Sequence, residues 1–208
     1  MKRLAVLVSG GGSNLQALID NIEAGRIDAR IALVIASKPG VFALERAKKA
    51  GIPTQVIRRG EYATQDAFDD ALLAALREAA IEGVVLAGYL SILSARVVRA
   101  YERAILNIHP ALIPSFCGKG YYGGRVHSAV LAYGAKVSGA TVHFVDEGAD
   151  TGPIILQDTV RVEEDDTPET LAARVLEVEH RILPQAVGLF CEDRLELDGR
   201  KVRIRPAK

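Results

Sequence analysis

Short apolar runs alternate with segments of helical periodicity through the first half of the chain. The runs predict strands at residues 4–8, 31–36, 54–57, 84–87 and 104–108. Between them, apolar residues recur every three or four positions, which predicts helices at residues 15–22, 41–50, 68–79 and 95–100. Gly25, Gly51 and Pro53 supply stop signals for the first two helices.

The pattern changes after Gly134. Residues 137–145 and 154–162 form longer and more alternating runs, which are typical of antiparallel strands. Apolar residues at helical spacing from 171 to 182 then predict a long helix, and we expect Pro184 to kink or end it.

This succession of segments predicts an α/β fold. Near-continuous apolar strands are buried on both faces, so we expect a Rossmann-like, mostly parallel twisted sheet with helices on both faces. The later runs predict an antiparallel C-terminal extension of the sheet, and Asp198-Gly199 predicts a hairpin. Because no repeat or linker is evident, residues 1–208 are expected to form a single domain, with a Rossmann-like half at 1–110 and a second half at 111–208.

Composition and charge narrow the class of protein. Of the 208 residues, 49% are apolar, which is enough for a sizeable core. Lys+Arg and Asp+Glu number 26 each, so charge gives no argument for nucleic acid or a membrane surface. No apolar run reaches the ~18 residues of a membrane span, and the run behind Met1 is too short for a secretory signal. Cys117 and Cys191 lack Cys-x-x-Cys spacing, which favours free thiols in the cytoplasm.

A glycine-rich stretch, Ser9-Gly10-Gly11-Gly12-Ser13-Asn14, lies between the first predicted strand and helix. Glycines let the backbone approach an anion, and a helix N-terminus offers N–H groups and the positive end of a dipole. A dinucleotide fingerprint counted from Gly10 would require glycine at Leu15, and the Gly-Lys-Ser/Thr of a Walker loop does not occur. The stretch therefore favours a site for one phosphate; the alternative is a tight turn capped by Ser13.

Asn107 and His109 end the fifth predicted strand and precede Pro110. Because side chains alternate along a strand, the amide and the imidazole are expected to point to the same face. Pro110 favours an extended His109 and ends the ladder of hydrogen bonds. Two donors at the carboxyl end of a parallel strand can hold an oxyanion. The alternative is that both side chains bond to neighbouring backbone.

An acidic loop, His143-Phe-Val-Asp146-Glu147-Gly-Ala-Asp150-Thr-Gly-Pro153, follows the first of the antiparallel runs. One of its carboxylates could orient His109 and raise the pKa of the imidazole. The other interpretations are a solvated surface loop and metal ligation by His143, Asp146 and Asp150. No fixed ligand spacing supports a metal, and we expect none.

Four motifs occur in order along the chain. They are Ser-Gly-Gly-Gly-Ser-Asn-Leu-Gln at 9–16, Leu-Ala-Gly-Tyr-Leu at 86–90, Leu-Asn-Ile-His-Pro-Ala-Leu-Ile-Pro at 106–114, and His-Phe-Val followed by Gly-Pro-Ile-Ile-Leu-Gln within 143–157. Together they resemble the folate-dependent phosphoribosylglycinamide formyltransferases of purine synthesis, from Leu4 to about Leu197. The resemblance implies transfer of a formyl group from 10-formyltetrahydrofolate, as co-substrate, to the amine of glycinamide ribonucleotide.

The resemblance also implies a role for each candidate residue. Asn107 and protonated His109 would stabilise the oxyanion, while Asp150 would raise the pKa of His109 and help to relay the proton. The phosphate of the nucleotide would bind to Gly11, Gly12, Ser13 and Asn14, and its ribose or glycinamide part to Glu179. The second half of the chain would complete the folate site, whose expected residues are Gln65, Leu90, Ser91, Ile92, Leu93, Asn107, Val145 and Asp146.

Some positions depart from the family pattern. Gln65 stands where an arginine near the folate tail can occur, and Ser91 replaces a longer residue. The loop at 115–125 is longer and richer in glycine than expected for the family. Its tyrosines could pack over a ligand, so we predict that the loop is a mobile lid. A fixed connection is the alternative. The expected partners are the two small-molecule substrates, without nucleic acid or a membrane, and the chain is expected to be a monomer or homodimer.

Three other functions compete with formyl transfer to the nucleotide. Formyltetrahydrofolate deformylase looks similar around Asn107, His109 and Asp150, but it carries an N-terminal regulatory domain, whereas the first strand here begins almost at residue 1. Methionyl-tRNA formyltransferase is longer, with a C-terminal barrel. A Rossmann oxidoreductase or a non-catalytic nucleotide-binding module would explain only the glycine-rich stretch.

Overall fold

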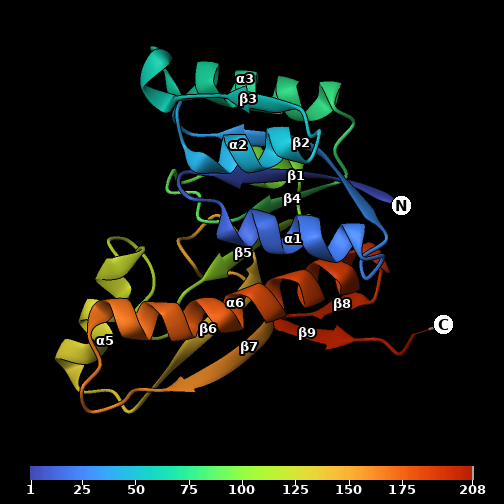
Figure 1. The fold of residues 1–208 in the computed structure, drawn as a ribbon. Helices are drawn as coiled ribbons and strands as arrows, with labels where there is room; N and C mark the ends of the chain where they lie inside the picture. Colours follow the sequence, from blue (N-terminus) through green and yellow to red (C-terminus); the bar gives the residue numbers. More distant parts are fainter. Residues whose placement is uncertain (208) are drawn as a thin grey trace. The chain divides into compact units, whose positions relative to one another are not determined.

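The computed structural model describes residues 1–207, which form two compact units that divide between Asn107 and Ile108. Figure 1 shows the chain as a ribbon coloured along the sequence. The predicted α/β class is confirmed, because parallel strands with helices form the first unit and antiparallel strands with helices form the second. No helix in this part of the chain is long and apolar enough to span a bilayer.

The first unit is built on parallel strands in the order β3-β2-β1-β4-β5. They are β1 (Lys2–Val8), β2 (Ala29–Ala36), β3 (Thr54–Val56), β4 (Gly83–Leu86) and β5 (Ile105–His109), whose last two residues belong to the second unit. Leu4 to Val8 have no exposed surface. The near-continuous apolar runs are therefore explained by burial on both faces.

Helices connect these strands. They are α1 (Ser13–Glu23), α2 (Phe42–Lys49), α3 (Gln65–Glu78) and α4 (Ala95–Ala100), and a 3-10 turn, η1 (Arg59–Glu61), precedes α3. Leu15 of α1 and Leu72 of α3 are fully buried, so the apolar face predicted from the spacing is the face that packs. The side chains of Thr64 and Ser94 accept hydrogen bonds from backbone N–H groups and cap α3 and α4.

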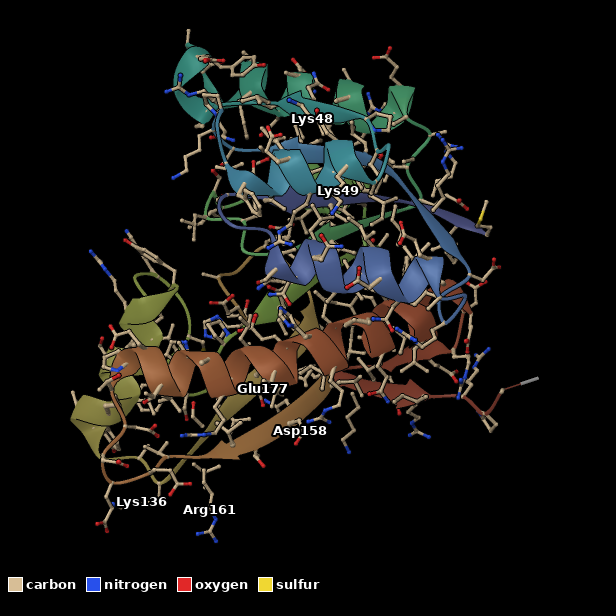
Figure 2. All side chains as sticks on the ribbon, viewed as in Figure 1. Lys48, Lys49, Lys136, Asp158, Arg161 and Glu177 are labelled. Atoms are coloured by element: carbon tan, nitrogen blue, oxygen red, sulfur yellow. The ribbon has the colours of Figure 1, made fainter. Side chains whose placement is uncertain are left out.

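The second unit contains an antiparallel pair covered by a long helix. Its elements are α5 (Gly124–Tyr133), β6 (Val137–Phe144), β7 (Ile154–Arg161), α6 (Pro168–Cys191), β8 (Leu195–Asp198) and β9 (Lys201–Ile204). Strands β6 and β7 pair antiparallel, as their alternating pattern predicted. Asp158, labelled on β7 in Figure 2, accepts a hydrogen bond from Arg181 of α6 at 2.6 Å. The predicted hairpin is formed by β8 and β9.

Two helical features of the second unit differ from the prediction. Helix α6 continues through Pro184 to Cys191, so the expectation that Pro184 could end it is wrong. Leu183 and Val187 beside Pro184 are fully buried, and this apolar packing outweighs the loss of one backbone N–H. The sequence pattern does not predict α5, because Val126 and Val130 supply only one turn of apolar spacing behind two glycines.

Candidate active site

His109 ends β5, as the following proline predicts, and only 4% of its surface is exposed. Its Nε2 lies 2.9 Å from the carbonyl oxygen of Phe116. Because a carbonyl oxygen only accepts, Nε2 donates in this contact. Its Nδ1 lies 3.6 Å from Oδ2 of Asp150. Both ring nitrogens therefore face acceptors, and the two contacts favour the doubly protonated ring.

Asp150 lies in the loop between β6 and β7, with a left-handed φ of 57°. The Gly118 N–H donates to its Oδ2 at 2.9 Å. His143 Nε2 lies 3.7 Å from Oδ1, while His143 Nδ1 donates to the Phe144 carbonyl at 2.8 Å. The carboxylate thus lies between two imidazole rings, each of which is held at its other nitrogen by a backbone carbonyl.

Burial and charge have opposite effects on the pKa values of His109 and Asp150. Burial lowers the pKa of His109, and this effect exceeds the increase that comes from Asp150 and from the Phe116 carbonyl. The expectation that Asp150 raises the pKa of His109 is correct for that one contribution, but the net shift is downward. For Asp150, burial raises the pKa, yet hydrogen bonds from His143 and Gly118 and the charge of His109 together lower it. The pKa of Asp150 therefore lies below its usual range, which keeps the carboxylate charged at neutral pH.

His127 is a further histidine that the sequence pattern did not indicate. It lies on α5 with 4% of its surface exposed, and its Nδ1 is buried without a hydrogen-bond partner among residues 1–207. Burial lowers the pKa of His127, and a charge on His109 lowers it further. The position of His127 on the buried face follows from the helical spacing of α5. Because the sequence pattern does not predict that helix, it does not point to His127 either.

The glycine-rich stretch of the first unit leads into α1. Gly12 precedes the helix with a left-handed φ of 72°, and no side chain caps the first turn. The turn capped by Ser13, considered as an alternative, is therefore not formed. Asn14 is buried, and the first turn contains no acidic residue. Backbone N–H groups of a first helical turn have no intrahelical acceptor, so this end of α1 suits an anion.

The segment at 90–93 combines exposed apolar residues with a fixed backbone. Leu90 and Ile92 are exposed by 59% and 70%, whereas Leu93 is buried. The Leu90 N–H donates to Oγ of Ser9 at 2.9 Å, which ties this segment to the end of β1. An anchored loop with exposed apolar side chains provides a surface for an apolar ligand group.

Gln65 begins α3 with both ends of its side-chain amide engaged. Its oxygen accepts from Arg59 Nε at 2.9 Å, and its nitrogen donates to Asp69 at 2.7 Å. Asp69 is buried and also accepts from the Ser94 hydroxyl at 2.5 Å. Gln65 therefore belongs to a network that joins α3 to the N-terminus of α4, directly after the segment at 90–93.

The remaining predicted residues lie on three elements. Asn107 is half-buried on β5, Glu179 is buried on α6, and Val145 directly follows β6. Asp146 accepts hydrogen bonds from the Thr151 hydroxyl at 2.6 Å and the Gly148 N–H at 3.1 Å, so its carboxylate shapes the loop. In the described part of the chain no three His, Cys, Asp or Glu side chains form a group that could hold a metal ion.

Comparison with known proteins gives a consistent result. The profile of the formyl transferase family matches residues 2–187. The chloroplastic phosphoribosylglycinamide formyltransferase of Arabidopsis thaliana is 43% identical, over 94% of this chain and 67% of that protein. The trifunctional purine biosynthetic protein adenosine-3 of Bos taurus is 47% identical, over 97% of this chain and 19% of that protein. The crystal structure of glycinamide ribonucleotide transformylase 1 from Symbiobacterium toebii matches with a TM-score of 0.94 at 44% identity, over 99% of this chain and 95% of that one.

Proposed function

We propose that this chain catalyses formyl transfer in purine biosynthesis, because it belongs to the formyl transferase family. The proposed reaction moves the formyl group of 10-formyltetrahydrofolate to the amine of glycinamide ribonucleotide. The names of the relatives in Arabidopsis thaliana and Symbiobacterium toebii support this choice of substrate. The observation that carries the proposal is the buried contact of 3.6 Å between His109 and Asp150.

The chemistry needs a group that stabilises negative charge and a path for one proton. The substrate amine attacks the formyl carbon, and the carbonyl oxygen becomes an oxyanion. His109 Nε2 already donates to a carbonyl oxygen, that of Phe116, so the oxyanion can take the place of that acceptor without any rotation of the ring. The amide of Asn107 supplies a second donor to the oxyanion.

Asp150 stabilises the charged form of His109 through Nδ1 while Nε2 acts on the substrate. One proton leaves the attacking amine and one reaches the folate nitrogen as the carbon–nitrogen bond breaks, so the charges balance. His109 and Asp150 assist this transfer through water. His143 holds the far oxygen of the carboxylate in place.

The other residues bind the two substrates. The phosphate lies at Gly11, Gly12, Ser13 and Asn14, and Glu179 bonds to the ribose or the glycinamide group. The folate is held by the segment at 90–93, by Asn107 and by Val145 and Asp146. Gln65 supports the folate segment through Asp69 and Ser94 and does not need to contact the folate itself. A cytoplasmic location and a monomeric or homodimeric state stay predictions.

The proposal is tested by following tetrahydrofolate release with and without glycinamide ribonucleotide. Release should depend on the nucleotide, and His109→Ala should reduce kcat by about 10²–10³-fold, the usual loss for one oxyanion donor. Release at the same rate without the nucleotide would identify a deformylase. Binding of NAD(P) without formyl transfer would identify an oxidoreductase, and normal turnover in His109→Ala would remove His109 from the mechanism.

A further inference from the structure

Arg46 of α2 reaches the glycine-rich stretch with its guanidinium group. Its Nε donates to the carbonyl oxygen of Gly11 at 2.9 Å, and its Nη1 donates to the side-chain oxygen of Gln16 at 3.1 Å. The guanidinium carbon also lies 4.8 Å from the centre of the Phe42 ring. These three contacts fix a long side chain that would otherwise be mobile, since Arg46 is only half-buried.

The carbonyl group of Gly10, one residue before Gly11, also points to α2. The oxygen of Gly10 accepts from the Ala43 N–H at 3.2 Å. Two successive carbonyl oxygens, those of Gly10 and Gly11, therefore bond to donors on the first turns of α2. Neither is available to face an anion on the opposite side of the stretch.

Because the peptide unit is planar, these two hydrogen bonds also determine where the N–H groups of Gly11 and Gly12 point. In a trans peptide the C=O and the following N–H lie in one plane and point in opposite directions. The bond from Ala43 to Gly10 therefore turns the Gly11 N–H away from α2. The bond from Arg46 to Gly11 does the same for the N–H of Gly12, the residue directly before α1.

Close packing supports the same arrangement. A Cβ at Gly12 would lie 2.6 Å from Cβ of Ala43, so α2 touches the backbone of the stretch directly. Gly12 also has a φ of 72°, which favours glycine. The stretch cannot move toward α2, and the Arg46 contact determines the rotation of the Gly11–Gly12 peptide.

We propose that Arg46 is a positioning residue for the phosphate of the nucleotide substrate. It holds the Gly11 carbonyl away from the phosphate and aims the Gly12 N–H at it, and its positive charge adds attraction. This inference rests on the proposed function, because it assumes that the glycine-rich stretch binds that phosphate. It predicts that Arg46 matters only for ligands that carry the phosphate.

The test compares binding of glycinamide ribonucleotide with binding of the same compound without phosphate, glycinamide riboside, by calorimetry. Arg46→Gln should weaken binding of the nucleotide by about 10-fold or more, as for loss of one charged hydrogen bond, and leave binding of the riboside unchanged. Arg46→Lys, which keeps the charge and one donor, should recover part of the loss. In turnover assays the KM for the nucleotide should rise, while kcat and the KM for the folate stay the same.

Lys48→Gln is the matched control. Lys48 lies on the same helix, is exposed, and pairs with Glu45 at 3.6 Å, so its removal changes the charge of α2 equally. It should leave the affinity for the nucleotide nearly intact. Equal losses for both ligands in Arg46→Gln, or equal effects of Arg46→Gln and Lys48→Gln, would overturn the inference.

The two levels of the proposal fail in different ways. If the unmodified protein binds the nucleotide and the riboside equally, the phosphate site of the proposed function is wrong. If the unmodified protein distinguishes the two ligands and Arg46→Gln does so to the same degree, only the role of Arg46 is wrong. If Arg46→Gln does not fold, the two ligands are compared with Arg46→Lys instead. The lysine keeps the charge but places its donor differently. If Arg46→Lys still prefers the nucleotide to the riboside as strongly as the unmodified protein does, Arg46 is not a positioning residue.

Discussion

At the scale of single residues, the contact between Asp150 and His109 sets the pH range of the proposed reaction. The proposed mechanism requires protonated His109, so the rate should fall as pH rises through its pKa. Asp150 raises that pKa against the larger lowering by burial. Asp150→Asn should therefore shift the fall in kcat/KM to lower pH and reduce kcat by about 10²-fold or more.

The pH–rate profile of kcat/KM measures this shift. Asp158→Asn is a suitable control, because Asp158 lies on β7 and pairs with exposed Arg181. It removes one carboxylate from the same unit without touching His109. A profile of Asp150→Asn that coincides with that of the unmodified protein would show that the two groups do not act together.

At the scale of single residues, the sequence predicts where a side chain lies better than it predicts what that side chain contacts. Strand alternation and Pro110 were sufficient to predict that His109 stands at the end of β5. The acidic loop was predicted to supply a carboxylate to His109, but other hydrogen bonds around the site could not be predicted, because their partners come from segments far apart in the chain. The bond from Arg46 to Gly11 spans 35 residues and that from Ser94 to Asp69 spans 25, and neither follows from a local pattern.

At the scale of elements, the loop between β5 and α5 is anchored to the catalytic pair. The Phe116 carbonyl accepts from His109, and the Gly118 N–H donates to Asp150. A substrate oxyanion would compete with the Phe116 carbonyl for the same proton. The loop would give up this anchor only while the oxyanion exists, so a complex with a non-reactive substrate analogue keeps both anchors.

Trypsin can report on this loop, because Lys119 is exposed within it. His109→Ala removes one anchor and should accelerate cleavage after Lys119 several-fold. In the unmodified protein, bound nucleotide together with a non-reactive folate analogue should slow this cleavage. Arg125 was predicted to be the last residue of the lid, but it lies in α5 and stacks on Tyr122 at 4.9 Å, so it serves as an internal control. Equal cleavage after Lys119 in all three cases would exclude a lid.

Element positions were predicted well where apolar periodicity was long, and poorly where it was short. Strands β1 to β5 lie within two residues of their predicted limits. Helix α5 escaped prediction because only two of its apolar residues, one turn apart, face the core. Pro184 was expected to kink or end α6, but the helix does not end there, because the residues around Pro184 are buried. In both cases tertiary burial, which a local pattern does not contain, decides the outcome.

At the scale of the whole molecule, the acids and histidines with a lowered pKa lie in the second unit. They include His109, His127, Asp150, Asp158, Asp166 and Glu196. A group with a lowered pKa binds fewer protons in the folded state than in the unfolded state. Stability is therefore lost as pH falls below the unfolded pKa, which is about 6.5 for histidine and about 3.9 for aspartate.

The second unit should therefore lose stability first on acidification. Between about pH 6.5 and pH 5, only the histidines contribute, because the carboxyls stay ionised there. Hydrogen exchange at pH 7.5 and pH 5, corrected for the intrinsic rate, should show a loss of protection in β6, β7 and α6 and little change in β1 and β2. His127→Gln removes one group whose pKa is lowered by burial and should reduce the loss in the second unit. If both units lose protection equally, or if His127→Gln behaves like the unmodified protein, the buried histidines do not govern the acid response.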